Sequence, residues 1–183
     1  MTKTYYFRNT TSHVGSVGIS NRDLETTTGT STTESSFAGN SPDWWDWYSA
    51  NSEPNLTDWP NGTYTWYLVV STANSIVELT SVRLIRMNSS RSSILASTTN
   101  TVNITLSSVQ TYSGTIDWSS GQNPGGRSSS DIFAIEYIFT RISGHGNQEV
   151  VFKVNGPSDS RVDTPLEAAA GIPQNILIVW EET

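Results

Sequence analysis

The stretch TYTWYLVV at residues 63–70 decides the fold class of this chain, because large apolar side chains alternate strictly within it. On an extended chain, Tyr64, Trp66, Leu68 and Val70 point to one side, and the residues between them point to the other. A period of two built from aromatic and β-branched residues is typical of a strand with one face in a core. The stretch therefore predicts the first core strand.

The same alternation predicts further strands on both sides of the Gly/Ser-rich loop at residues 119–130. They are expected at residues 76–87, 94–96, 102–106, 111–118, 131–142, 149–154, 161–164 and 175–180. Residues 131–142 are apolar on both faces and are expected to form a central strand, with residues 149–154 as its hairpin partner. The residues expected in the core include Trp66, Leu68, Val82, Leu84, Ile104, Ile135, Tyr137 and Phe152.

The composition supports strands over helices. Charged residues make up 15% of the chain and apolar residues 35%, so that Ser, Thr, Asn and Gly supply most of the remainder. These residues favour pleated surfaces and turns. Together with the number and spacing of the strands, this predicts an all-β protein, an antiparallel β-sandwich with a jelly-roll-like Greek key.

The chain divides into three expected parts. Residues 1–41 are polar and rich in Thr and Ser, which predicts an extended arm that contacts another chain. Residues 42–61 contain the cluster PDWWDWY and several turn signals, and are expected to form an aromatic linker. Residues 62–183 are expected to form the β-sandwich domain, ending in a C-terminal strand.

Charge and residue usage restrict the partners. The net charge of −7 should repel phosphate backbones, so a nucleic-acid partner is not expected. The sequence contains no cysteine, and no apolar stretch suggests a signal peptide or a membrane span. We therefore expect folding in a cytoplasm without disulfides, and no membrane partner.

The sequence contains no strong motif for catalysis, for cofactor binding or for metal binding. Residues 121–128, GQNPGGRS, are similar to a phosphate-binding loop but lead into a predicted strand instead of a helix. His13 and His145 have no second ligand at metal spacing. An acidic cluster comprises Asp43, Asp46, Glu53 and Asp58; it is compatible with a glycosidase pair or with Ca²⁺, although capping and solvation of turns are the commoner roles. We expect no enzyme, no cofactor and no metal.

The aromatic residues are the candidate functional residues. The interface candidates are Trp44, Trp45, Trp47, Tyr48, Trp59, Tyr5, Tyr6 and Phe7. Three interpretations are open for the tryptophan cluster: the rings cap the core, they anchor a subunit interface, or they form a platform for sugar stacking.

Four stretches resemble phage-encoded structural proteins, among them the jelly-roll auxiliary proteins of tailed-phage heads. They are WPNGTYTW at 59–66, VRLIRMNSS at 82–90, FAIEYIF at 133–139 and EVVFKVN at 149–155. The resemblance implies a virion component, made in the host cytoplasm, with no chemistry of its own. It would be a capsid cement or decoration protein, bound to the major capsid protein or other virion proteins and present as a homotrimer. The alternatives are a carbohydrate- or receptor-binding module of a viral fibre and, third, a jelly-roll glycosidase.

Overall fold

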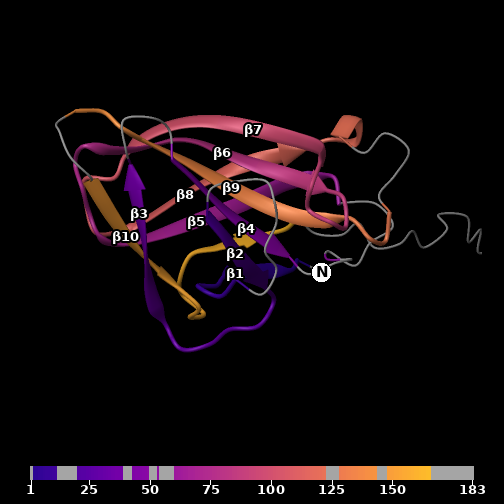
Figure 1. Cartoon of the computed structure of the whole chain (residues 1–183), viewed down its shortest axis with the longest axis horizontal. Coiled ribbons are helices and arrows are strands. Elements are labelled where there is room, and N and C mark those ends of the chain that lie inside the picture. Colours follow the sequence, from indigo (N-terminus) through magenta and orange to yellow (C-terminus); the bar gives the residue numbers. More distant parts are fainter. Residues whose placement is uncertain are drawn as a thin grey trace, which may run out of the picture.

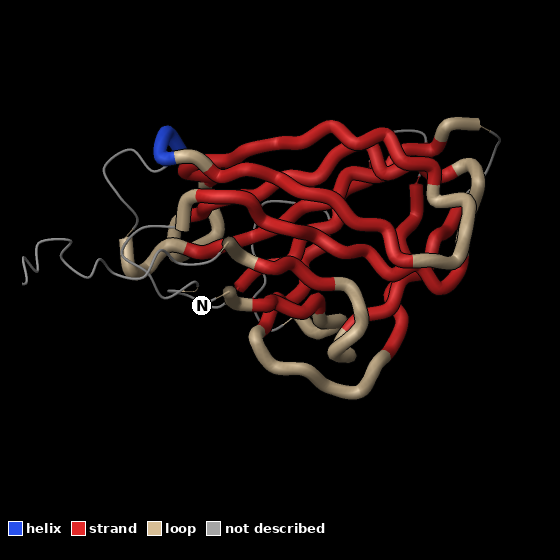
Figure 2. The backbone as a smooth tube through the Cα atoms, turned by 180° about the vertical axis from the view of Figure 1, so that it is seen from behind, coloured by secondary structure: helices blue, strands red, loops and turns tan. Residues whose placement is uncertain are grey.

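The computed structural model describes residues 2–11, 20–38, 43–49, 53, 60–122, 128–143 and 148–165. Strands make up nearly all of its regular structure, apart from a single turn of 3₁₀ helix, η1 (Ser120–Gln122) (Figure 2). The strands are β1 (Thr4–Phe7), β2 (Ser20–Glu25), β3 (Thr32–Ala38), β4 (Asp43–Ser49), β5 (Gly62–Thr72), β6 (Val77–Met87), β7 (Ile94–Thr105), β8 (Thr111–Trp118), β9 (Ile132–Arg141), β10 (Gln148–Val154) and β11 (Arg161–Asp163). The all-β prediction is confirmed.

Eight of these strands form two layers in jelly-roll order (Figure 1). One layer runs β8-β5-β10-β3 and the other runs β7-β6-β9-β4. Between β3 and β10 the chain changes layer at every connection except that from β6 to β7, which is the jelly-roll pattern of two Greek keys. Strands β2, β1 and β11 continue outward from β4 and reach β5, so that they join the two layers in one open sheet.

The core lies between the layers and is rich in aromatic rings. Trp66 of β5 meets Tyr137 of β9 edge to face at 5.9 Å, and Phe139 of β9 stacks on Phe152 of β10 at 5.9 Å. Seven of the eight predicted core residues are fully buried, and Ile104 is partly buried against them. Burial of each such ring contributes roughly 1.5–3 kcal/mol to folding.

The predicted arm is wrong for the described part of residues 1–41. Strand β1 pairs with β11 and β2, β3 pairs with β10, and the side chains of Tyr5 and Phe7 are buried in the common core. The segment is too polar to form a core of its own, but it needs only a few apolar side chains to join a core that other strands provide.

The predicted linker at residues 42–61 also needs correction, because its aromatic part is strand β4 of the second layer. Strand β4 pairs in parallel with β2, so the sheet is mixed, whereas an antiparallel one was expected. Trp45 and Trp47 alternate into the core while Asp46 and Tyr48 take the opposite face. Thus β3 and β4, taken from the sequence as arm and linker, each supply an outer strand of the jelly roll.

Two strand predictions fail in detail. The predicted strands at residues 94–96 and 102–106 are parts of one continuous strand, β7, which ends at Thr105. Strand β10 pairs with β3 and β5 instead of forming a hairpin with β9, because the chain crosses to the other layer between them. The predicted C-terminal strand at residues 175–180 lies outside the described residues.

Candidate functional site

The interface candidates lie mostly inside the protein. Tyr5, Phe7, Trp45, Trp47 and Tyr48 are at most 5% exposed. Phe7 stacks on Trp47 with 4.5 Å between ring centroids, and Trp47 meets Tyr137 edge to face at 5.7 Å. These five rings therefore form core contacts within the chain and are not free to anchor a neighbour or to stack on a sugar. Tyr6 is half-buried, and the side chain of Trp44 and the whole of Trp59 lie outside the described part of the structure.

A buried polar cluster lies on the outer face of β4, β9 and β6. Asp46 and Glu136 are cross-strand partners, only 1% and 2% exposed. Arg83, the β6 partner of Glu136, binds both of its carboxylate oxygens at 2.8 Å, and Tyr48 donates a hydrogen bond to Asp46 at 3.0 Å. The two carboxyl groups are neighbours on adjacent strands, and two buried carboxylates repel one another unless one of them keeps a proton.

The proton resides on Asp46. Burial, followed by the negative charge of Glu136, raises the pKa of Asp46 to about 8, and the opposing effects of Tyr48 and Arg83 are smaller. Burial together with Asp46 also raises the pKa of Tyr48 above its usual range, so its hydroxyl stays a donor. The carboxyl pair resembles a catalytic pair in chemistry, but its burial leaves no room for a substrate between the two groups. We interpret it as a structural cluster.

Of the other acids in the predicted cluster, Glu53 does not join this pair. Glu53 lies at another place, where it accepts hydrogen bonds from Tyr5 at 2.9 Å and from Lys3 at 3.1 Å. The side chain of Asp43 and the whole of Asp58 lie outside the described residues. Glu136, which does pair with Asp46, was missed because the two residues are far apart in the sequence and meet only through strand pairing.

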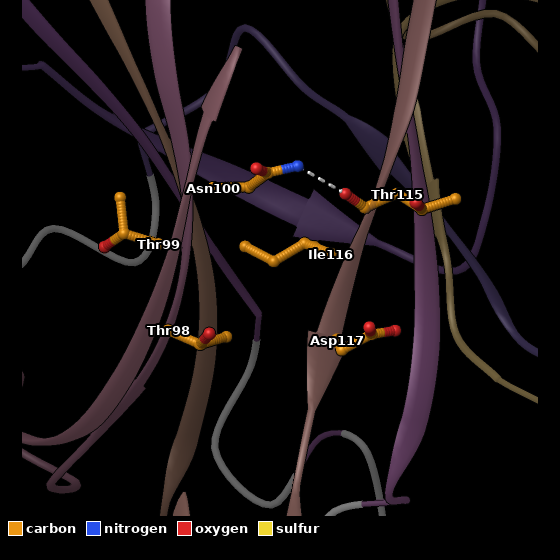
Figure 3. Close-up of a pocket in the computed structure, with 6 residues that line it drawn as sticks. All are labelled: Thr98, Thr99, Asn100, Thr115, Ile116 and Asp117. Carbon is orange, nitrogen blue, oxygen red and sulfur yellow. Dashed lines mark hydrogen bonds between the residues drawn. The ribbon is translucent and has the colours of Figure 1, made fainter.

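A polar cavity opens where the two layers meet at β7 and β8 (Figure 3). We call it the β7–β8 cavity. It has a volume of about 290 Å³ and is lined by Thr98, Thr99, Asn100, Thr115, Ile116 and Asp117. Strands β7 and β8 belong to different layers, with β6 and β5 as their respective neighbours. The cavity therefore lies between two strand edges.

The arrangement of the lining follows from strand alternation. Thr98 and Asn100 pair with the core residues Leu84 and Val82, so they share the inward-facing side of β7. Ile116 is 4% exposed and belongs to the core, whereas Thr115 and Asp117 are exposed on the outer side of β8. The cavity thus has an apolar side at Ile116 and a polar rim.

One hydrogen bond spans the cavity. The side-chain amide of Asn100 donates to the backbone carbonyl of Thr115 at 2.9 Å (Figure 3). On the rim, Thr63 of β5 donates to Oδ1 of Asp117 at 2.6 Å. Sequence reasoning missed this site, although one signal was present. Thr98 and Asn100 are polar residues at positions where the alternation of β7 otherwise places Ala96, Val102 and Ile104 against the core.

The weaker motif candidates gain no support. Of the phosphate-loop-like segment, only Gly121, Gln122 and Ser128 are described, and the backbone N–H of Ser128 donates to Asp131 in a turn before β9. His13 and His145 lie outside the described residues. Within the described ranges, no three His, Cys, Asp or Glu side chains gather as metal ligands, and no helix is long and apolar enough to cross a membrane.

Comparison with known proteins adds no relative: no family model and no curated protein matches this chain.

Proposed function

We propose that this protein is a non-enzymatic virion component whose jelly roll serves as a receptor- or carbohydrate-binding module. The β7–β8 cavity is the observation that carries the proposal, because the hydroxyl of Thr98 and the amide of Asn100 face it together with the apolar side chain of Ile116. Ligand sites commonly have such a mixture of polar groups and apolar surface. Viral capsid proteins and lectins are among the proteins that use jelly rolls, although the fold alone does not define a function.

The virion part of the proposal rests on the resemblance to phage structural proteins. The choice of a binding role over a cement role rests on the burial of the aromatic rings. Tyr5, Phe7, Trp45, Trp47 and Tyr48 were the anchors expected to bridge capsomers, and all five pack inside the chain. Recognition in this proposal takes place through hydrogen bonds and does not involve a chemical reaction.

The second candidate is the capsid cement or decoration protein, and one observation favours it. Strand β7 is 12 residues long, contains no charged residue and no proline, and has β6 as its paired neighbour. Edge strands are usually protected by charges, prolines or bulges, and β7 lacks the first two, although its pairing with β6 is irregular at two places. An edge without charge favours pairing with another chain. In this case the partner is the major capsid protein or a second copy within a trimer, and a strand added to β7 would cover the β7–β8 cavity.

Cell binding distinguishes the two candidates. Fluorescently labelled protein is incubated with cells that the virus infects, before and after mild periodate oxidation of their surface sugars. The binding module predicts saturable binding that oxidation removes. Absence of saturable binding, together with tight binding to purified capsids, would overturn the proposal in favour of the cement protein.

A further inference from the structure

We propose that the outer face of β1, β11 and β5 binds a carboxylate-bearing sugar, an inference in which the choice of a sugar rests on the proposed binding role. Three residues form the site, which we call the Tyr–Arg–Tyr row. The strand register places Tyr6 of β1 opposite Arg161 of β11, and Arg161 opposite Tyr67 of β5. Residues paired in this way lie about 5 Å apart on the same face of a sheet. The three side chains are therefore direct neighbours.

The Tyr–Arg–Tyr row faces away from the core. The next residue along each of the three strands belongs to the buried core: Phe7 in β1, Val162 in β11 and Trp66 in β5. Successive side chains of a strand point to opposite faces, so the row points outward, and its three residues are partly exposed. The row shares no residue with the β7–β8 cavity and is a separate site.

Arg161 is held in position and keeps unused hydrogen-bond donors. Its Cζ lies 3.9 Å from the centroid of the Tyr67 ring, so the guanidinium is placed over that ring. Its Nη1 donates to the backbone carbonyl of Asp159 at 3.4 Å, and no carboxylate of the described chain forms an ion pair with it. A guanidinium has five N–H donors in a planar fork that matches both oxygens of a carboxylate. Arg161 can therefore bind a carboxylate through two hydrogen bonds.

A second cation lies on the same face. Lys153 of β10 is exposed and alternates with the core residues Phe152 and Val154, so it points outward from the layer. Its backbone carbonyl accepts a hydrogen bond from Ser160 at 3.0 Å, directly before Arg161. Among the described carboxylates, none forms an ion pair with Lys153. In a chain with a net charge of −7, two such cations on one face favour an anionic ligand there.

The acidic residues of this face have partners of their own. Asp163, the next outward residue of β11, accepts a hydrogen bond from Thr4 at 2.7 Å. Glu25 of β2 forms an ion pair with Arg8 at 3.6 Å. Neither carboxylate forms an ion pair with Arg161, so a carboxylate from a ligand would not have to displace one.

The tyrosines favour a sugar over other anions. Within the described part of the chain, no side chain stacks on the Tyr6 ring, and no group forms a hydrogen bond with the hydroxyl of Tyr6 or Tyr67. A tyrosine ring offers an apolar surface for the C–H face of a sugar, and its hydroxyl can bond a sugar hydroxyl. The two tyrosines are two strand spacings apart, about 9.6 Å, which leaves room for one sugar unit over Arg161. An acidic peptide would use the arginine but would not need the rings.

Nuclear magnetic resonance can test the site directly. The ¹⁵N-labelled full chain is titrated with the methyl glycosides of glucuronic, galacturonic and N-acetylneuraminic acid, each raised to about 50 mM to detect weak binding. Each acid is compared with its methyl ester, which keeps the sugar and removes the charge. The expected result is saturable shifts of the backbone amides at residues 5–7, 66–68 and 160–162 with at least one acid, and binding about tenfold weaker for its ester.

Three results would overturn the inference. They are equal affinity for acid and ester, no shifts at these residues with any of the three acids, and equally tight binding of N-acetylaspartate. The last result would show an anion site that does not recognise sugar.

Matched variants assign the effect to the Tyr–Arg–Tyr row. Arg161→Gln should weaken binding about tenfold, whereas Arg161→Lys keeps the charge without the planar fork and should give a smaller loss. Tyr6→Leu removes the stacking ring and should weaken binding about threefold. Lys3→Gln is the control, because Lys3 bonds Glu53 on the opposite face of β1, as Tyr5 does. Equal weakening by the control would contradict the assignment. If Arg161→Gln does not fold, Arg161→Lys and the esters decide.

Failure of the inference can be told from failure of the proposed function. Cell binding that survives Arg161→Gln and Tyr6→Leu unchanged would reject the Tyr–Arg–Tyr row and retain the binding role. Binding of an acidic glycoside to the row without any binding to cells would retain the site and reject the role as a receptor-binding module.

Discussion

Asp46 of β4 and Glu136 of β9 face one another as cross-strand partners, and both are buried on the outer face of their layer. Two adjacent buried carboxylates cannot both be ionised at low cost, which explains why one of them retains a proton and why Arg83 binds the other. Two further buried charged residues lie nearby: Arg91 is close to Tyr48, and Asp23 is close to Arg91. Folding in this protein is therefore linked to pH.

The first prediction is that stability falls as pH rises from about 4 to about 8. The pKa of Asp46 is about 8 in the folded protein and near 3.8 when unfolded, so the folded state binds the proton more tightly. The stabilisation by this group is complete below the unfolded pKa and is lost as pH rises through the folded pKa. At about 1.4 kcal/mol per pH unit between the two pKa values, chemical denaturation from pH 5 to pH 8.5 should show wild type losing roughly 4 kcal/mol relative to Asp46→Asn. Parallel pH profiles for the two proteins would show that Asp46 is not the group responsible.

The second prediction concerns the ion pair of Arg83 with Glu136. Glu136 is 3% exposed at its side chain, so Arg83→Met leaves a buried carboxylate without its cation and should lower the free energy of unfolding by about 3 kcal/mol. The exposed pair of Lys3 and Glu53 is the control, with side chains 38% and 33% exposed. Lys3→Met should cost less than about 1 kcal/mol. Denaturant titration at pH 7 measures both, and similar losses would contradict the account.

The third prediction tests whether the N-terminal segment belongs to the core. Phe7 is fully buried and stacks on Trp47, so Phe7→Ala should lower the free energy of unfolding by about 3–5 kcal/mol. Tyr6 is its half-buried neighbour on the other face of β1, and Tyr6→Ala should cost clearly less. Thermal unfolding compares the variants. If Phe7→Ala melts like wild type, the segment is an arm after all.

The fourth prediction concerns the close contact of β8 with a core ring. A Cβ added at Gly114 would lie 2.6 Å from Cζ2 of Trp66, and the fully buried ring has no space to move. Gly114→Ala should therefore destabilise the protein by about 1–3 kcal/mol. Gly121→Ala is the matched control, because its nearest atom would be 3.6 Å away. An unchanged melting temperature for Gly114→Ala would show that the two strands are not packed as described.

The strands that could be predicted from the sequence are those with long alternation. In β5 and β8 every second side chain faces the core, and in β6 the same alternation holds on either side of an irregularity between Leu79 and Ser81. The period of two is therefore visible without knowledge of the partner strands. Strands β3 and β4 were missed as sheet strands, because Thr and Ser dominate one and adjacent aromatic and acidic residues the other. The positions of β3 and β4 in the sheet depend on their pairing with β10 and β9, respectively. The local sequence of a strand does not show which strand it will pair with.

The functional residues were harder to predict for the same reason. The aromatic cluster attracted attention by its composition, yet alternation in β4 sends Trp45 and Trp47 into the core. The residues that line the β7–β8 cavity come from two strands, and neither strand has an unusual sequence on its own. Only the meeting of the two layers brings Asn100 and Ile116 toward one another.

Quantitative mass spectrometry of purified virus particles tests the proposed function most directly. The account predicts that the protein is present in intact particles at a fixed copy number well below that of the major capsid protein, as befits a receptor-binding module. A copy number close to that of the major capsid protein would support the cement role instead. Absence of the protein from particles that are otherwise complete would contradict the account.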